Sequence, residues 1–457
     1  MIEIARSVHI IGVGGAGMSG LAKLLAQLGH SVTGSDLRRG PAFDSLSDAG
    51  IEVWEGSDPV RMGTAELVVA SSAVPDHDLE WTTARDLGIE RWRRPQLLDA
   101  VTSSMNTIGA TGTHGKTTST AMMIACLRVL GVDPSFLVGG MLTDMNTNAH
   151  LGNRELLVIE ADEAFGTFQS LHLSGLTVTN VEEEHLDYYE TLYRLEDAFA
   201  EVVRNTDGPV TVNRDDPGGR RLAERTGATT YGLSESADWV ISDIVEGRHG
   251  TGFSLKSTSW AGTVSVAVPG LHNVSNAAGV LSVLGEMGFD VGRAAEALNV
   301  FQGTHRRFEH RGTVAGVTII DSYAHHPTEV AADLRAARQG EWKNIWAVFQ
   351  PHLYSRTARF SREFGMALSV ADRVVVTDVY AARETPLPGV TGRLVADAAM
   401  ASMGGTVEYV AHRADLAAYL ADRVEPGDLV LTMGAGDITT IPDELAVLLA
   451  GGHRDVD

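Results

Sequence analysis

Short apolar runs alternate with longer segments of helical periodicity along the whole chain. The apolar runs have the length and the β-branched composition of buried strands. We predict strands at residues 8–13, 67–70, 106–110, 156–159, 176–179, 317–320, 345–349, 374–377 and 429–432. Strands separated by helices are typical of parallel βαβ units, so the pattern predicts an α/β fold with parallel sheets.

Two places divide the chain into regions. A second glycine-rich turn unit starts after residues 94–104, and a third run of strand and helix alternation starts after residues 302–312. A chain of 457 residues is also too long for one ordinary core. We therefore predict domains at residues 1–103, 104–303 and 304–457.

Polar or glycine residues stand at the carboxyl end of each predicted strand. They are Gly14, Ser71, Gly112, Glu160, Asn180, Asp321, Gln350, Asp378 and Gly434. Open parallel sheets bind their ligands in the crevice at this edge. The placement predicts one shared architecture for the functional site.

The segment HIIGVGGAGMSGLA reads as a strand, the motif Gly12-x-Gly14-x-x-Gly17, and a helix. Gly12 permits the tight turn, Gly14 lets a diphosphate approach the backbone, and Gly17 allows close helix packing. Asp36 ends the following strand, at the spacing of a ribose-binding acid. The motif does not distinguish NAD from a nucleotide-sugar, and a glycine-rich turn without ligand is its plainer interpretation.

A second glycine loop, TGTHGKTTS, joins a strand to an apolar helix. Its backbone amides can cradle phosphates, Lys116 can reach the terminal ones, and a threonine hydroxyl can hold Mg²⁺. Ala110 stands where the strict phosphate-loop pattern has glycine. The segment nevertheless predicts binding of a nucleoside triphosphate.

Acidic residues follow the next two predicted strands. LLVIEADE delivers Glu160, Asp162 and Glu163, and NVEEEHLD delivers His185. Carboxylates at strand ends beside a phosphate loop are hard oxygen ligands that suit Mg²⁺. A solvated acidic loop and a surface histidine are the alternatives.

Arginines and histidines dominate the later motifs. Arg307, Arg356 and Arg383 are candidate anion clamps, because a guanidinium binds carboxylate or phosphate bidentately. The adjacent pair His325 and His326 lacks the spacing and the further ligands of a zinc site. No hydrolase triad can be assembled from local signatures.

The bulk composition narrows the function classes. A formal net charge of -23 argues against nucleic-acid binding, which needs a basic surface. The single cysteine, Cys126, fits a reducing compartment. The N-terminus has no signal-peptide core and no run is long enough to insert in a membrane, so a cytoplasmic protein is expected.

Taken in order, the motifs resemble those of the Mur ligase family from one end of the chain to the other. Those that carry the resemblance are HIIGVGGAGMSGLA, TGTHGKTTS, EADE, NVEEEHLD, HNVSNA, HRRFE, DSYAHHPTE, FQPHLYSRT, DVYAARETPLPG and MGAGD. GVGGAGMSG and FQPHLYSRT are most similar to members that add L-alanine to UDP-N-acetylmuramate, and less to the peptide-recycling members.

The resemblance implies a three-domain α/β protein, with an N-terminal Rossmann-like domain, a central P-loop ATPase-like domain and a C-terminal Rossmann-like domain. It implies ATP and Mg²⁺, with UDP-N-acetylmuramate and L-alanine as the other small-molecule substrates. A homodimer is one candidate assembly.

The resemblance also implies site residues. The UDP-sugar would contact Gly14, Gly15, Ala16, Gly17, Met18, Asp36, Ser71 and Ser72. ATP would contact Gly112, Thr113, His114, Gly115, Lys116, Thr117, Thr118, Asn273, Asn276, Arg307 and Asp321. Mg²⁺ would contact Thr117, Glu160 and His185. The muramate carboxylate and alanine would contact His325, His326, His352, Arg356 and Arg383, and catalysis would rest on Lys116, Glu160, His185, His326 and Arg356.

Four positions depart from the pattern of the family. Ala164 and Phe165 replace a usual serine and aspartate, Glu184 replaces an aspartate, and Leu353 stands where arginine is frequent. No lysine lies between His185 and Leu255, so the carbamylated lysine of some members has no counterpart. A related ligase with another amino acid or peptide, and a silent nucleotide-binding homologue, are the alternatives.

Overall fold

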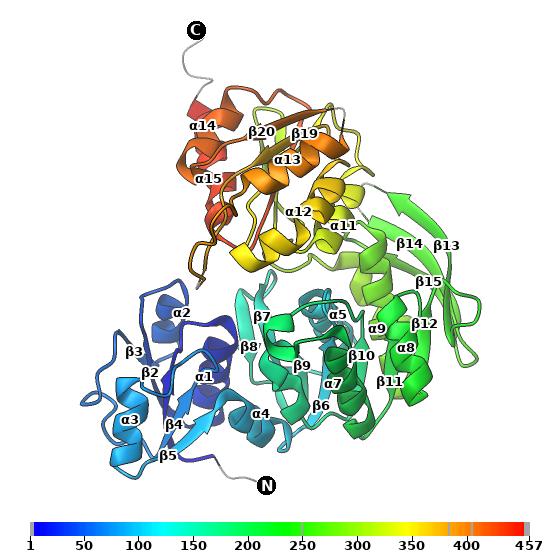
Figure 1. Cartoon of the computed structure of the whole chain (residues 1–457). Helices are drawn as coiled ribbons and strands as arrows, with labels where there is room; N and C mark the ends of the chain where they lie inside the picture. The colour runs from blue at the N-terminus through cyan, green and yellow to red at the C-terminus, as the bar shows by residue number, and fades with distance from the viewer. Residues whose placement is uncertain (1–3, 248–249, 383, 404, 452–457) are drawn as a thin grey trace. The chain divides into compact units, whose positions relative to one another are not determined.

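The computed structural model describes residues 4–247, 250–382, 384–403 and 405–451 (Figure 1). The chain forms two compact units. One consists of Met1–Ile244, Gly252–Ala267 and Asn273–Gln302, and the other of Val245–Thr251, Val268–His272 and Gly303–Asp457.

The first unit begins with a five-stranded parallel sheet of order β3-β2-β1-β4-β5. Its strands are β1 (Ser7–Ile11), β2 (Ser31–Asp36), β3 (Glu52–Glu55), β4 (Leu67–Ala70) and β5 (Glu90–Arg93). Its helices are α1 (Ala16–Leu28), α2 (Ala42–Asp48), α3 (Leu79–Asp86) and α4 (Arg94–Thr102). The strand order reverses between β1 and β4, and ligands of such sheets bind at this switch point.

A ten-stranded sheet of order β15-β14-β13-β12-β11-β10-β6-β9-β7-β8 follows in the same unit. Its strands are β6 (Asn106–Thr111), β7 (Pro134–Leu142), β8 (Thr147–His150), β9 (Asn153–Glu160), β10 (Gly175–Val178), β11 (Val210–Asn213), β12 (Thr229–Gly232), β13 (Trp239–Gly247), β14 (Gly250–Lys256) and β15 (Ala261–Val266). Its helices are α5 (Lys116–Val129), α6 (Leu186–Tyr189), α7 (Leu192–Asn205), α8 (Pro217–Thr226), α9 (Leu271–Glu286) and α10 (Val291–Glu296), with 3-10 turns at Ala164–Ser170 and Ala297–Val300.

The register of this sheet decides which loops meet at its carboxyl edge. β6 pairs in parallel with β9, so that Ala110 lies opposite Glu160. On its other side β6 pairs with β10, so that Thr111 lies opposite Val178. The loops after β9 and β10 therefore flank the glycine loop that follows β6.

Polar contacts join α1 to the β7–β8 hairpin, beside which it lies in Figure 1. The Asn148 side-chain amide donates to the Ala16 carbonyl at 2.8 Å and to the Ser19 hydroxyl at 3.3 Å. The Lys23 ammonium donates to the Asn148 side-chain oxygen at 3.2 Å. These contacts hold the first turn of α1 against the central sheet, and burial lowers the pKa of Lys23.

The second unit contains a six-stranded sheet of order β16-β17-β21-β18-β19-β20, in which only the β16–β17 pair is antiparallel. Its strands are β16 (Glu309–Val314), β17 (Val317–Ser322), β18 (Ile345–Phe349), β19 (Arg373–Val376), β20 (Thr406–Tyr409) and β21 (Leu429–Met433). Its helices are α11 (Pro327–Ala337), α12 (Tyr354–Leu368), α13 (Arg393–Ser402), α14 (Leu416–Ala421) and α15 (Ile441–Gly451), with 3-10 turns at Arg413–Asp415 and Asp437–Thr440.

Each predicted strand has a counterpart, and the predicted α/β class with parallel-rich sheets is confirmed. The domain boundaries near residues 103 and 303 stay predictions, since the first two sheets belong to one compact unit. In the described ranges, no helix combines the length and the apolarity needed to cross a membrane.

Candidate functional site

The first glycine-rich turn is tied to the ends of the neighbouring strands. Gly12, with φ 79°, donates its amide to the Ser35 carbonyl at 2.8 Å. The Gly14 amide donates to the Asp36 carboxylate at 2.9 Å. A Cβ on Gly12 would lie 3.0 Å from the Cβ of Ser71. The turn therefore brings Gly14, Asp36 and Ser71 together at the switch point.

The other residues predicted to contact a UDP-sugar lie in the same region. Ser72 follows Ser71 after β4, and the N-terminus of α1 contains Gly15, Ala16, Gly17 and Met18. No acidic residue lies in the first turn of α1. The Met18 amide donates to the Gly15 carbonyl at 3.0 Å, so the amides of Ala16 and Gly17 are the ones in this turn that are suited to bind an anion.

The second glycine loop can form only because its glycines leave room for neighbours. Gly112 has φ 133°, and a Cβ on it would lie 2.1 Å from the Thr179 hydroxyl. Gly115 has φ 82°, and a Cβ there would lie 2.6 Å from the Asn276 side-chain oxygen. Both glycines combine left-handed backbone with close approach, which no other residue tolerates well. Asn276 is thereby placed against the loop.

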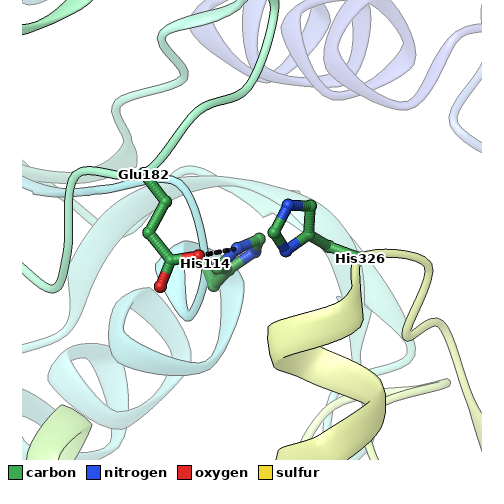
Figure 2. A group of neighbouring side chains, drawn as sticks. All are labelled: His114, Glu182 and His326. Atoms are coloured by element: carbon green, nitrogen blue, oxygen red, sulfur yellow. Dashed lines mark ion pairs between the residues drawn. The ribbon is translucent and has the colours of Figure 1, made fainter. Parts of the chain in front are cut away.

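The segment after β10 holds the loop from its other side. The His114 amide donates to the Asn180 side-chain oxygen at 2.8 Å, and the Thr113 amide donates to the Asn180 carbonyl at 3.2 Å. The His114 ring lies 3.6 Å from the Glu182 carboxylate (Figure 2). His326, also drawn there, belongs to the second unit, where its side chain caps α11.

The Lys116 ammonium, at the start of α5, is surrounded by oxygen atoms. It donates to the carbonyls of Gly112 at 2.8 Å and Thr113 at 3.1 Å. It also contacts the fully buried Glu163 carboxylate, at 2.8 Å from one oxygen and 3.0 Å from the other. Asp162 stands 3.9 Å away. The cation that would bind phosphate is therefore paired with a carboxylate inside the protein.

Burial and charge act together on this ion pair. Burial lowers the pKa of Lys116, but the carboxylates of Glu163 and Asp162 outweigh it, and the net shift of that pKa is upward. Burial raises the pKa of Glu163 to about 7, although Lys116 opposes the shift. Lys116 is therefore charged at every physiological pH.

Glu160 and Thr117 lie on either side of two glycines in β7. The Gly139 amide donates to the Glu160 carboxylate at 2.8 Å, and a Cβ on Gly139 would lie 2.8 Å from that carboxylate. A Cβ on Gly140 would lie 3.1 Å from the Thr117 methyl group. The glycines thus admit both side chains to the carboxyl edge of the sheet.

His185 lies beside the acidic segment after β9. Its ring is 3.9 Å from the Glu163 carboxylate, and it occupies left-handed backbone with φ 53°. Potential ligand atoms of Asp162, Glu163 and His185 all lie within 4.8 Å of one another. This donor set, with Glu160 close enough to raise the pKa of Lys116, is chemically suited to a hard divalent cation such as Mg²⁺.

The substituted segment after Glu163 is an aromatic patch. Phe165 and Gly166 have φ 56° and 66°, and the Phe165 ring packs edge-on at 6.1 Å from Tyr188. The Tyr189 hydroxyl donates to the Glu163 carbonyl at 2.6 Å. Phenylalanine is a poor residue for left-handed backbone, so Phe165 is held there by its surroundings.

In the second unit, the fully buried Asp321 is engaged on both carboxylate oxygens. It accepts hydrogen bonds from the hydroxyls of Thr432 at 2.8 Å and Thr439 at 2.7 Å. Arg306 lies 3.3 Å from it. Its predicted contact with ATP stays a prediction, and its observed contacts join β17 to the segment after β21.

Arg307, predicted to bind ATP, pairs with the carboxylate of Glu329 at 3.3 Å and lies over the Tyr323 ring. Asn273, another predicted ATP contact, is buried in α9. Thr118 is buried in the first turn of α5.

A ring cluster forms at the carboxyl ends of β17 and β18. His325 packs 5.2 Å from Tyr323 and 5.9 Å from His352, which stacks 5.9 Å from Tyr380. Arg356 lies 3.0 Å from the His352 ring nitrogen. Three predicted substrate residues therefore meet here, while Arg383 lies outside the described residues. Leu353 precedes α12 with φ 68°.

The predicted site list omitted several residues that the structure brings to these places. Tyr323 and Tyr380 stood within quoted motifs, so their position beside His325 and Asp378 could have indicated them. Arg94 follows directly after β5 and could have been found by the strand-end rule. Glu163 was named as a candidate ligand, but its pairing with Lys116 depends on the register of β6 and β9.

Three family profiles cover most of the chain. "Mur ligase family, catalytic domain" matches residues 7–105, "Mur ligase middle domain" residues 110–284, and "Mur ligase, glutamate ligase domain" residues 306–436.

Whole-length relatives agree with these profiles. The UDP-N-acetylmuramate--L-alanine ligase of Cutibacterium acnes is 42% identical over 454 residues, covering 97% of this chain and 96% of that protein. The enzyme of the same name from Rubrobacter xylanophilus is 42% identical over 451 residues, covering 97% and 100%.

Solved structures show the same fold. The UDP-N-acetylmuramate-alanine ligase of Thermotoga maritima superposes with a TM-score of 0.85 at 28% identity, over 98% of this chain and 99% of that one. A murein peptide ligase from Psychrobacter arcticus gives 0.70 at 25% identity, over 98% and 99%. The profiles, the full-length relatives and the three-domain α/β fold agree, and this chain belongs to the Mur ligase family.

Proposed function

We propose that this protein joins L-alanine to the lactyl carboxylate of UDP-N-acetylmuramate and converts ATP to ADP and phosphate. One observation carries the proposal: a diphosphate-type glycine turn and a lysine-bearing phosphate loop lie in one compact unit, linked through Asn148. The relatives with that activity match over nearly their whole length, which favours it over peptide addition.

In this proposal the N-terminal turn holds the UDP-sugar. The helix dipole and the free amides of α1 attract the diphosphate. Asp36 is bonded to the Gly14 amide, so it fixes the shape of the turn as well as standing near a ribose. The three-part division at residues 103 and 303 assigns this task to the first domain.

The phosphate loop holds ATP, with Asn276 against Gly115 and Asn273 in the same helix. Thr117, Glu160 and His185 are the proposed Mg²⁺ ligands, and Asp162 and Glu163 lie close to His185. Bound Mg²⁺ would neutralise charge on the β- and γ-phosphates. From the C-terminal unit, the proposal assigns Arg307 and Asp321 to ATP, and His325, His326, His352, Arg356 and Arg383 to the carboxylate and alanine.

The proposed reaction has two steps. A carboxylate oxygen attacks the γ-phosphorus and ADP leaves, which gives an acyl phosphate. The alanine nitrogen then attacks the acyl carbon, loses a proton, and phosphate leaves. Each transition state concentrates negative charge, which a pre-placed ammonium such as that of Lys116 stabilises without reorganisation.

The test is a reaction of purified protein with Mg²⁺, ATP, UDP-N-acetylmuramate and L-alanine. We expect phosphate release and a UDP-N-acetylmuramoyl-alanine mass only when all four are present. Replacing alanine by serine or glycine measures how strictly the protein selects alanine. Replacing it by the tripeptide L-alanyl-γ-D-glutamyl-meso-diaminopimelate tests the peptide-ligase alternative.

Two outcomes would refute the proposal. Product formation with the tripeptide but not with alanine would assign the chain to the recycling ligases. ATP binding without amide formation from any acceptor would identify a silent homologue. Binding of NAD by calorimetry would assign the first glycine motif to a nicotinamide dinucleotide and not to a nucleotide-sugar.

A further inference from the structure

Arg94, the first residue of α4, lies against the first turn of α1. A Cβ built on Gly17 would be 2.7 Å from a terminal guanidinium nitrogen of Arg94, 2.9 Å from Cζ and 3.3 Å from Nε. At distances below 3.0 Å one of the two groups must move, and here that group is the flexible guanidinium. The third glycine of the fingerprint therefore makes room for a guanidinium, in addition to the helix packing expected from the sequence.

The guanidinium of Arg94 has no partner within the described part of the chain. Its Nε is buried without a hydrogen bond, and no ion pair or ring contact involves this side chain. A buried donor without an acceptor destabilises the folded protein, and more so when the group is charged. Such a group is retained where a ligand supplies the acceptor.

The adjacent Arg93 is a direct contrast. It donates to the carbonyls of Ser71 at 3.4 Å and Val74 at 2.8 Å, pairs with Asp76 at 2.5 Å, and lies over the Trp81 ring. Both terminal nitrogens of Arg93 are thus bonded to the segment after β4. The two arginines are neighbours at the junction of β5 and α4, yet only Arg93 has acceptors among the described residues.

The electrostatic surroundings of Arg94 also point to an anion. The N-terminus of α1 carries partial positive charge, and its first turn contains no acidic residue. The carboxylate of Asp36, at the end of β2, accepts a hydrogen bond from the Gly14 amide. A guanidinium facing a helix N-terminus is repelled unless an anion lies between them.

We propose that Arg94 binds the diphosphate of the nucleotide-sugar against the N-terminus of α1. This inference rests on the proposed function, because it takes the UDP-sugar as the ligand of the first glycine turn. A guanidinium offers two parallel donors that match phosphate oxygens, which a lysine cannot reproduce. In a protein of net charge -23, such a local cation is what retains a doubly charged diphosphate.

The experiment compares Arg94→Met and Arg94→Lys with the wild type by calorimetric titration of UDP and of uridine. Arg94→Met should weaken UDP binding by at least tenfold and change uridine binding less than twofold. Arg94→Lys keeps the positive charge but lacks the two parallel donors of the guanidinium, so its UDP affinity should lie between those of the wild type and Arg94→Met. The KM for ATP should stay within twofold in both variants. Circular dichroism and thermal unfolding verify folding.

Arg91→Met is the matched control, because it removes one positive charge from β5, the strand directly before Arg94. Arg91 contacts the carbonyl and the ring of Trp81, away from α1. The Arg91→Met variant should bind both UDP and uridine within twofold of the wild type. If Arg94→Met is poorly folded, the Arg94→Lys comparison with UDP decides alone.

Unchanged UDP affinity in a folded Arg94 variant overturns the inference. Equal losses for UDP and uridine overturn it as well, since they indicate a deformed turn and not a phosphate contact. Failure of the proposed function appears differently: the wild type would bind UDP but form no amide product. In that case the Arg94 result still holds for whatever nucleotide-sugar the protein uses.

Discussion

The two glycine-rich turns both follow a buried parallel strand and both begin a helix, but they treat their cation in opposite ways. In the second turn, Lys116 donates to two loop carbonyls and to the buried carboxylate of Glu163. In the first turn, Arg94 lies against Gly17 with a buried Nε and no acceptor in the described residues. One cation is neutralised before any ligand arrives, and the other is left for the ligand to neutralise.

The difference suits the two proposed ligands. ATP arrives with its own divalent cation. When the Lys116 ammonium moves from the Glu163 carboxylate to a phosphate, one ion pair replaces another. A UDP-sugar brings no such cation in this proposal, so its diphosphate needs a cation that the protein does not already use. The comparison can be tested by altering each cation, the group that faces it, and Asp333, a buried carboxylate that forms no ion pair within the described residues.

Lys116→Ala should have the largest effect. Removal of an electrostatic contact to the reacting phosphate costs about 100- to 1000-fold in kcat, and Lys116 is the cation of the loop, so at least a 1000-fold loss of ligation is expected. UDP affinity should stay within twofold, because the first turn is untouched. The measurement is phosphate release with UDP titration, and Lys343→Ala is the control at an exposed lysine. Near-normal ligation by Lys116→Ala would refute the phosphate-loop assignment.

Gly17→Ala should have the next largest effect. Gly17 has no positive φ, so alanine fits the helical backbone and should raise helix stability slightly. Its methyl group must displace the guanidinium of Arg94, and UDP affinity should fall about tenfold. Calorimetric titration of UDP measures this effect.

The double variant Gly17→Ala/Arg94→Met provides the control for this prediction. If Gly17 acts only through Arg94, the double variant should bind UDP no more weakly than Arg94→Met alone. Additive losses would show that Gly17 serves helix packing independently of the guanidinium.

Glu163→Gln should act in the opposite direction. The carboxylate competes with phosphate for Lys116, and the neutral amide competes less, so ATP should bind several-fold more tightly in the variant. Binding is measured in EDTA, so that a divalent cation does not contribute. Glu155→Gln, at an exposed position early in β9, is the control. Weaker ATP binding by Glu163→Gln would mean that Glu163 holds Lys116 in its working position.

Asp333→Asn should have the smallest effect on ligation and on ligand binding. It separates the effect of burial from the effect of ion pairing on a carboxylate. Burial raises the pKa of Asp333 to about 7, and its side-chain contact is a hydrogen bond from the Ser322 hydroxyl. Because the folded pKa is above the unfolded one, this group favours folding at low pH, and its contribution is lost as pH rises toward 7.

Asparagine removes that titration and can still accept the Ser322 hydrogen bond. Relative to the wild type, the variant should therefore gain up to about 3 kcal/mol of stability as pH rises from 5 to 8, since linkage contributes about 1.4 kcal/mol per pH unit below the folded pKa. Thermal unfolding of the variant and the wild type at pH 5 and at pH 8 measures this difference in stability. An equal difference at both pH values would show that Asp333 does not titrate in this range.

Sequence patterns predicted the strands with continuous apolar runs but not those of more polar or interrupted sequence. β5 reads Glu-Arg-Trp-Arg and β12 reads Thr-Thr-Tyr-Gly, which carry too few apolar residues for a clear strand pattern. These strands form because neighbours in the sheet supply their hydrogen bonds. The antiparallel β7–β8 hairpin was missed because Gly139 and Gly140 interrupt the apolar run of β7 and β8 reads Thr-Asn-Ala-His. The same two glycines admit the side chains of Glu160 and Thr117.

In the candidate site, too, the sequence predicted some features and missed others. By local pattern alone, the motifs placed Gly14 and Glu160 at or just past strand ends and Lys116 at the start of a helix, and the structure has them there. Their partners could not be predicted, because Lys116 meets Glu163 across 47 positions and Gly14 meets Asp36 across 22. Such contacts depend on strand register, which a one-residue slip would abolish.

The amino-acid sequence by itself determined the parallel α/β class, the two glycine turns and the acidic strand ends, because each depends on local periodicity and on backbone freedom at glycine. Only the tertiary structure decided that Glu163 neutralises Lys116 while no described residue neutralises Arg94. The reason is physical: the charge state of a site depends on which side chains folding buries together, and burial is set by the packing of distant strands and helices.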